Sequence, residues 1–272
     1  MAQRFYGVPV PDVTLNGDLP GRLVVLEGTD GVGRSTQMQL LRNWLESSGV
    51  AVFDTGLSRG NLAGRHIQQA KEGHTMGPRT QCLFYCTDFA DRLVNQIIPL
   101  LRAGYIVLTD RYIYSLMARA AVRGLERSWL KQVYGFALQP DLVLYLRVSL
   151  RNLIPRVLTS TGFDYWESGM DYLCEPSMYD AFVRHQTALL AEFERMVDEY
   201  DFKVVNADRS VRQTFESIQE HVCAVTEGML PQSTRLGLTP PLPVPQEKRN
   251  EERAVPSDRL REMLAVLLED VE

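Results

Sequence analysis

The sequence has no long apolar run: no stretch approaches the roughly 18 consecutive apolar residues that a membrane-spanning helix requires. Its first residues also lack the pattern of a secretory signal peptide. We therefore expect a protein that does not associate with membranes and that is cytoplasmic.

Cysteine is scarce as well. The four cysteines, Cys82, Cys86, Cys174 and Cys223, provide neither a disulfide framework nor the spacing of a metal site. Cys82 and Cys86 are four residues apart in a predicted helix, which indicates buried thiols rather than metal ligands.

Positive charge is not in surplus. The formal net charge is −5 and the calculated pI is about 5.5. Binding to a nucleic-acid polymer depends on clustered Lys and Arg, so this balance argues against it. A free nucleotide needs only a few local cations and remains a possible ligand.

The sequence does contain enough apolar material for a large core, since 45% of its 272 residues are hydrophobic. Short apolar runs occur at 23–27, 50–54, 106–109, 142–146 and 203–206. They lack strict polar alternation, which is typical of strands covered on both faces. Segments with helical spacing separate them, so the pattern predicts an α/β fold with a doubly wound parallel sheet. Ligands of such a sheet bind at the carboxyl ends of its strands.

The character of the chain changes near residue 228. We expect one α/β domain over 1–228, a Pro-rich and charged linker over 229–253, and an amphipathic helix over 254–272. A helix of that length is marginal alone, so its apolar stripe needs a surface. That surface is either the domain itself or a partner protein.

One segment carries most of the functional information. "GTDGVGRSTQ", residues 28–37, follows an apolar run and has the spacing of a phosphate-binding P-loop, except that Arg34 stands where the pattern has Lys. Main-chain N–H groups of residues 28–36 are expected to surround a polyphosphate, and Ser35 offers a hydroxyl to Mg²⁺. Arg34 keeps the positive charge but presents a planar, bulkier group than Lys.

A second segment, "YIVLTDRY" at 105–112, ends an apolar run with Asp110 and Arg111. The carboxylate is placed to hold metal-bound water or to orient an acceptor phosphate. The guanidinium is placed to neutralise charge on a transferring phosphoryl group.

Three segments together resemble the thymidylate kinase family of P-loop nucleoside monophosphate kinases: "LVVLEGTDGVGRSTQ", "LLRAGYIVLTDRYIYS" and "QPDLVLYLRVSLRNLIPRV". The resemblance covers residues 20–226. It implies a five-stranded parallel sheet of order 2-3-1-4-5, ATP and Mg²⁺ as cofactors, a nucleoside monophosphate as acceptor and a homodimer.

The resemblance also implies the site residues. The catalytic candidates are Arg34, Asp30, Asp110 and Arg111. The ATP-binding candidates are Gly28, Thr29, Asp30, Gly31, Val32, Gly33, Arg34, Ser35, Thr36 and Arg156, with Ser35 and Asp110 as metal ligands. The acceptor-binding candidates are Arg59, Phe84, Asp88, Arg92, Tyr112 and Arg119, with Phe84 matching the aromatic residue that stacks on the acceptor base.

Several positions depart from the family pattern. Asp88 stands where the family tends to have an Arg that reads the base, and the nearest arginine is Arg92. An exposed ion pair is the alternative interpretation of these two residues. Arg119 and Ala120 replace the usual Tyr and Gln, so the thymine-reading set is incomplete.

The lid region departs from the family pattern too. Residues 157–183 contain no Arg or Lys and are acidic, which predicts repulsion of a triphosphate. We hypothesise that Arg34 performs the work of both the missing Lys and a missing arginine finger.

Three functions therefore stay open. The first is a kinase that converts dTMP and ATP to dTDP and ADP. The second is a nucleotide-binding scaffold with little or no turnover. The third is a kinase of the same fold that acts on a different small acceptor.

Overall fold

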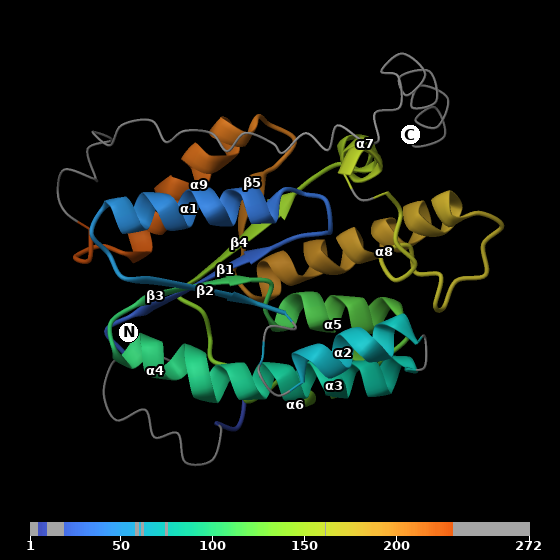
Figure 1. Ribbon diagram of the computed structural model, residues 1–272, viewed down its shortest axis with the longest axis horizontal. Helices are drawn as coiled ribbons and strands as arrows, with labels where there is room; N and C mark the ends of the chain where they lie inside the picture. The colour runs from blue at the N-terminus through green and yellow to red at the C-terminus, as the bar shows by residue number, and fades with distance from the viewer. Residues whose placement is uncertain are drawn as a thin grey trace.

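The computed structural model describes residues 5–9, 19–57, 60, 63–73, 76–160 and 162–230, and Figure 1 shows their arrangement. The predicted linker and C-terminal helix lie outside the described residues, apart from Met229 and Leu230.

Five parallel strands form one sheet with the order β2-β3-β1-β4-β5, which confirms the predicted topology. Their bounds are β1 Arg22–Glu27, β2 Val52–Gly56, β3 Ile106–Asp110, β4 Leu142–Arg147 and β5 Lys203–Asn206. Each apolar run of the sequence became a strand, and the second strand begins two residues later than predicted.

Helices connect the strands and cover both faces of the sheet. They are α1 Arg34–Ser47, α2 Gly64–Glu72, α3 Pro78–Arg92, α4 Ile98–Arg102, α5 Ile113–Val122, α6 Arg127–Val133, α7 Leu150–Ser160, α8 Met178–Glu199 and α9 Val211–Val225, with a π-helical turn at Leu93–Ile97. No helix in the described part of the chain is long and apolar enough to span a membrane.

The alternation of side chains along the strands produces two cores. In β1, Leu23 and Val25 point to the face covered by α3 and α5, whereas Val24 and Leu26 point to the face covered by α1 and α9. Figure 1 shows α1 and α9 on one side of the sheet and α3 to α6 on the other. Because both faces are buried, the strands need no polar alternation.

The strand order brings the two predicted functional segments together. β1 and β3 are direct neighbours, and their register pairs Leu26 with Asp110. The loop after β1 and the turn after β3 therefore leave the sheet at the same edge. This proximity follows from the topology, because the two segments are about 80 residues apart in the sequence.

Two further predictions concern α3. Cys82 is buried, as expected, whereas Cys86 is only half-buried, and burial raises the pKa of the Cys86 thiol to about 12. Asp88 and Arg92 form an ion pair, with Arg92 Nε 3.0 Å from Asp88 Oδ2. The alternative of an exposed pair is wrong, because both side chains are at most 1% exposed. Asp88 Oδ1 also accepts a hydrogen bond of 2.9 Å from the N–H of Gly60, which ties the segment after β2 to α3.

We predict that Asp88→Ala lowers the free energy of unfolding by about 3–5 kcal/mol, because it leaves the guanidinium of Arg92 buried without this carboxylate. The matched control is Glu46→Ala, which breaks an exposed pair of the same i, i+4 spacing with Arg42 and should cost less than about 1 kcal/mol. Urea titration followed by circular dichroism measures both. Equal, small losses for the two variants would contradict this account of α3.

Candidate active site

The loop between β1 and α1 has the backbone of a phosphate cradle. Gly28, Gly31 and Gly33 all have positive φ values, of 145°, 79° and 100°. A Cβ at Gly31 would lie 2.5 Å from the Cγ2 atom of Val157, so a larger residue does not fit there. Within the described chain, no hydrogen bond uses the main-chain N–H groups of residues 31–35. These donors stand at the N-terminus of α1, where they fit an anionic polyphosphate.

The side chain of Arg34 turns into this loop rather than outward. Its Nη1 donates to the main-chain oxygens of Gly28, at 2.5 Å, and of Thr29. Its Nε donates to Asp110 Oδ1 at 2.7 Å. The side chain is only 7% exposed. Arg34 thus closes the loop and joins it to the end of β3.

One nitrogen of this guanidinium is left for a ligand. Nη2 of Arg34 lies 3.5 Å from Asp30 Oδ1 and makes no hydrogen bond to any described residue. Because the other N–H groups are committed to the protein, the plane of the guanidinium is fixed. Arg34 can offer a phosphate the two hydrogens of Nη2 without leaving the loop.

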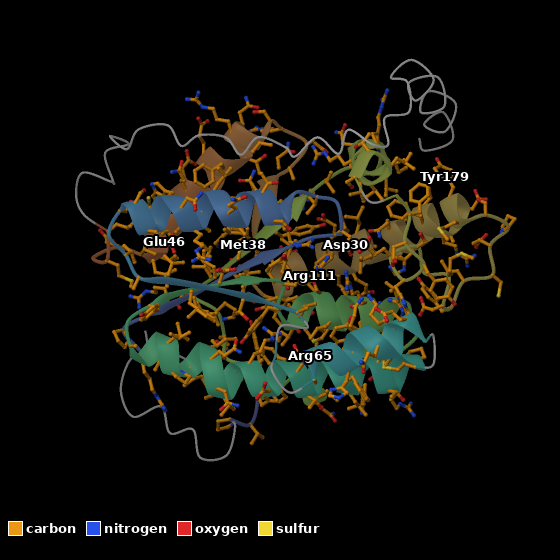
Figure 2. All side chains as sticks on the ribbon, viewed as in Figure 1. Asp30, Met38, Glu46, Arg65, Arg111 and Tyr179 are labelled. Atoms are coloured by element: carbon orange, nitrogen blue, oxygen red, sulfur yellow. The ribbon has the colours of Figure 1, made fainter. Side chains whose placement is uncertain are left out.

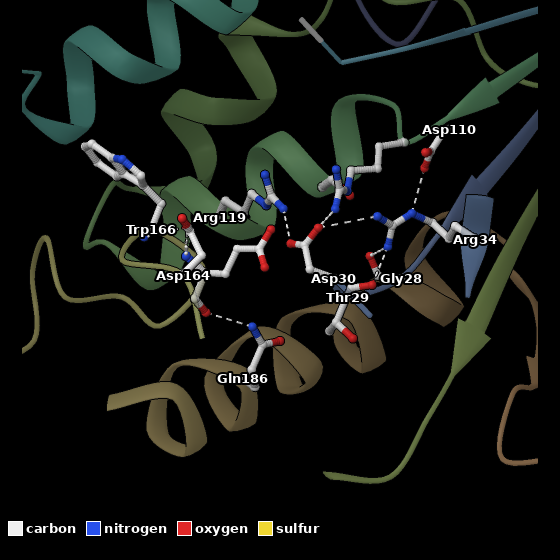
Figure 3. A network of polar contacts seen from close by, with 12 residues as sticks. Gly28, Thr29, Asp30, Arg34, Asp110, Arg119, Asp164, Trp166 and Gln186 are labelled. Atoms are coloured by element: carbon white, nitrogen blue, oxygen red, sulfur yellow. Dashed lines mark hydrogen bonds and ion pairs between the residues drawn. The ribbon is translucent and has the colours of Figure 1, made fainter. Parts of the chain in front are cut away.

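Asp30 is the centre of the charged network drawn in Figure 3. Its Oδ1 is paired with Nη2 of Arg111 and lies near Arg34, and its Oδ2 accepts from Nη2 of Arg119. Three guanidinium groups thus surround two carboxylates, those of Asp30 and Asp110. The remaining positive charge favours an anion at this edge of the sheet.

The turn after β3 places Arg111 in this network. Arg111 has a φ of 69°, which is uncommon for a residue with a side chain, and its N–H donates to the oxygen of Leu26 at 2.9 Å. The hydroxyl of Thr109 donates to the oxygen of Arg111 at 2.7 Å. Burial, followed by the positive charge of Arg119, lowers the pKa of Arg111 to about 9, so the group is charged at neutral pH. Figure 2 shows Arg111 and Asp30 close together beside the sheet.

Glu27, the last residue of β1, fixes the same turn from the other side. Its carboxylate accepts from the N–H of Tyr112 at 2.7 Å and from the N–H and hydroxyl of Ser115. It therefore caps the N-terminus of α5, which begins at Ile113. Burial raises the pKa of Glu27 to about 7, although the hydrogen bond from Ser115 opposes this shift.

A cavity of about 150 Å³ opens beside Asp30 and Arg111. Side chains of α2, α3 and α5 line it, and the segment between α7 and α8 closes one side with Trp166 and Glu167. Its charged lining is mostly basic. It contains four basic side chains, Lys71, Arg111, Arg119 and Arg123, and two acidic ones, Asp30 and Glu167. This composition suits an anionic ligand that lies next to the P-loop.

Several carboxylates of the acidic segment 157–183 have partners within the protein. Asp171 is paired with Arg123, and Glu175 is paired with Arg184. Asp164 accepts from the N–H groups of Trp166 and Glu167 at 2.9 and 3.1 Å. These three carboxylates are engaged within the protein, whereas Glu167 lines the cavity, and the repulsion of a triphosphate stays a prediction.

The structure places the predicted catalytic residues together and divides the other candidates. Asp30, Arg34, Asp110, Arg111 and Arg119 form one network. Arg156 lies on the flank of the P-loop, where its Nη1 donates to Val32 O and its Nη2 to Ala207 O.

The other acceptor candidates that the structure describes do not line the cavity. Phe84 is 37% exposed, and Asp88 and Arg92 are buried in the pair described above. Tyr112 is fully buried, and its hydroxyl donates to Leu138 O at 2.9 Å. Arg59 lies outside the described residues.

The sequence interpretation missed three residues that shape this site. Glu27 carries no motif of its own and acts only because β1 lies beside the turn after β3. Arg123 is four residues after Arg119, so helical spacing alone places the two on one face of α5. Lys71 lies near the end of α2 and lines the cavity. No motif or spacing in the sequence indicated this position.

The sheet order and the glycine-rich loop at the start of α1 define a P-loop NTPase of the α/β class. A phosphotransferase of this class needs a second site beside the loop, and the basic cavity lies there.

Comparison with known proteins gives the family. The sequence pattern of thymidylate kinase matches residues 26–218, so the chain belongs to the thymidylate kinase family. It is 30% identical over 194 residues to the probable thymidylate kinase 2 of Saccharolobus solfataricus, covering 71% of this chain and 91% of that one. It is 29% identical over 205 residues to the probable thymidylate kinase of Pyrococcus abyssi, covering 73% and 94%.

The raised pKa of Glu27 predicts a pH dependence of stability. The protonated form is favoured in the folded state, so this contribution is complete below pH 4.5 and is lost as the pH rises through about 7. The free energy of unfolding should therefore fall by about 3 kcal/mol from this group over that interval. Glu27→Gln should remove the fall, whereas the exposed Glu126→Gln should keep it. Urea titrations at several pH values measure it, and parallel curves for wild type and Glu27→Gln would contradict the assignment.

Proposed function

We propose that this chain transfers the γ-phosphoryl group of ATP to a nucleoside monophosphate, with dTMP as the leading acceptor and dTDP and ADP as products. The observation that carries the proposal is the Asp30 network, which joins the P-loop to the basic cavity. Membership of the thymidylate kinase family supports the reaction type.

The chain's own groups fit the polyphosphate of ATP. The N–H donors of residues 31–35, which have no partner among the described residues, and Nη2 of Arg34 all belong to the loop before α1 or to its first turn. Mg²⁺ bound with ATP would supply charge neutralisation at the phosphates. The hydroxyl of Ser35 and the carboxylate of Asp110 are its candidate oxygen ligands.

The acceptor would occupy the cavity with its phosphate toward Arg111 and Arg119. An oxygen of that phosphate forms the new bond to the γ-phosphorus, and the bond from the γ-phosphorus to the departing ADP breaks. The enzyme's contribution is to position the two nucleotides and to hold cations where negative charge spreads over the phosphoryl oxygens. Arg111 and Arg34 sit at the boundary between the two sites and are the cations that perform this work.

Two observations favour the alternative functions. Most N–H groups of Arg34 are bound to the protein, which favours a nucleotide-binding scaffold with slow turnover. Arg119 lines the cavity while Phe84 does not, which favours a small acceptor other than dTMP.

An acceptor panel separates these functions. Purified full-length chain with Mg-ATP is given dTMP, dUMP, dCMP, dAMP, dGMP or the corresponding ribonucleotides, and ADP release is followed by a coupled assay. We expect the highest kcat/KM with dTMP. A higher value with another acceptor would support the third function. ATP binding without release of ADP for any acceptor would support the scaffold.

The fixed geometry of Arg34 makes Arg34→Lys informative. A lysine ammonium cannot bind the oxygens of Gly28 and Thr29 while also holding Asp110 through a second nitrogen. We expect kcat to fall by about tenfold or more, a barrier increase of about 1.4 kcal/mol. Arg42→Lys, on the exposed face of the same helix, should change kcat less than about twofold. A kcat that rises in Arg34→Lys would show that the native arginine weakens the site.

Two further proposals concern partners. The family resemblance implies a homodimer, and Leu83 and Phe84 form an exposed apolar pair on α3 that such a contact would cover. A protein partner for the C-terminal helix also stays a prediction, as does a cytoplasmic location.

A further inference from the structure

The segment between α7 and α8 forms a wall of the cavity. Trp166 and Glu167 belong to it, and both line the cavity together with Lys71 and Arg123. Figure 3 shows Trp166 and Asp164 on this segment, across from Arg119 on α5. The position of this wall therefore decides the shape of the space beside Asp30 and Arg111.

Arg123 on the C-terminal side of α5 holds the wall in place. Its Nε and Nη2 donate to the two oxygens of Asp171 at 2.7 and 2.9 Å, which is a bidentate pair. Nη2 also donates to the main-chain oxygen of Trp166 at 3.0 Å, and Nη1 donates to the oxygen of Arg119 at 3.1 Å. The side chain is 4% exposed and that of Asp171 is 11% exposed. One guanidinium thus binds both ends of the turn and the helix that carries Arg119.

Two of the wall's other contacts are single hydrogen bonds to neighbouring helices. Trp166 Nε1 donates to the oxygen of Lys71 at 3.2 Å, and Gln186 Nε2 donates to the oxygen of Glu167 at 2.9 Å. They connect the turn to α2 and to α8. Each is a neutral bond of modest strength, whereas the pair with Asp171 is charge-assisted and partly shielded from water.

We propose that Arg123 and Asp171 form a positioning pair that fixes the 164–171 turn against α5 and thereby sets the affinity of the acceptor site. The inference rests on the proposed function, because it assigns the cavity to the acceptor. Arg123 acts through Trp166 and Glu167, which form the wall. Among the described residues, the pair makes no direct hydrogen bond or ion pair with the P-loop, although Arg123 binds the oxygen of Arg119, whose side chain pairs with Asp30. We therefore expect the pair to affect acceptor binding more than ATP binding.

The test compares Asp171→Asn with Glu175→Gln in the full-length chain. Glu175 is the matched control, because it is an acidic residue of the same segment that pairs with Arg184, whose side chain is 68% exposed. Asp171→Asn should raise the KM for dTMP at least tenfold and change the KM for ATP less than twofold. Glu175→Gln should leave both constants within twofold. Arg123→Lys keeps the charge but not the bidentate geometry. Its KM for dTMP should lie between the values of wild type and Arg123→Met.

Amide hydrogen exchange provides a readout that does not require turnover. Exchange across residues 164–173 should become at least tenfold faster in Asp171→Asn, exchange in β1 and α1 should stay as in wild type, and excess dTMP should restore part of the protection. Unchanged exchange or an unchanged KM for dTMP would overturn the proposal. Loss of protection across the whole sheet, or equal rises in both KM values, would overturn it in favour of a general role in stability. If wild type itself releases no ADP with any acceptor, the proposed function fails instead.

Discussion

The carboxylate of Asp30 is the contact on which the organisation of the site depends. It lies in the P-loop, yet it is paired with Arg111 from the turn after β3 and with Arg119 from α5, and it lies near Arg34. These groups come from three separate parts of the chain. Only the parallel register of β1 and β3 brings them within reach of one side chain. The result is a junction of excess positive charge between the phosphate loop and the cavity.

Arg34, which stands where the P-loop pattern has Lys, is buried and bonded within the fold rather than exposed at the surface. The guanidinium binds two carbonyl oxygens of its own loop and the carboxylate that ends β3. A lysine is a point charge on a flexible stem, whereas this arginine is held by several contacts, and its Nη2 lies 3.5 Å from Asp30 Oδ1. The side chain of Arg34 is therefore held more rigidly than a lysine would be, and Asp110 is one of the groups that hold it.

Much of the fold was predictable because it depends on local patterns. The five apolar runs predicted the strands, and the helical spacing of the segments between them predicted helices. The P-loop and the Asp-Arg after β3 predicted the core of the site for the same reason. The strand order that brings them together was implied only through the family resemblance.

The errors concern burial and side-chain pairing, which a single sequence does not encode locally. Asp88 and Arg92 have the spacing of an exposed helical pair, but their face of α3 packs against the segment that contains Gly60. The sequence pattern also did not indicate that Asp171 and Glu175 of the acidic segment 157–183 pair with Arg123 and Arg184. Phe84 matches a stacking residue by its place in the motif; its side chain is 37% exposed and is not part of the cavity lining, and its role stays a prediction.

Calorimetric titration of the full-length chain with Mg-ATP tests the central claim most directly. If the loop braced by Arg34 is a working phosphate cradle, the titration gives a saturable curve with one nucleotide per chain. If the titration shows no saturable heat even at high nucleotide concentration, the loop does not bind ATP. That result would show that Arg34 blocks the phosphate site.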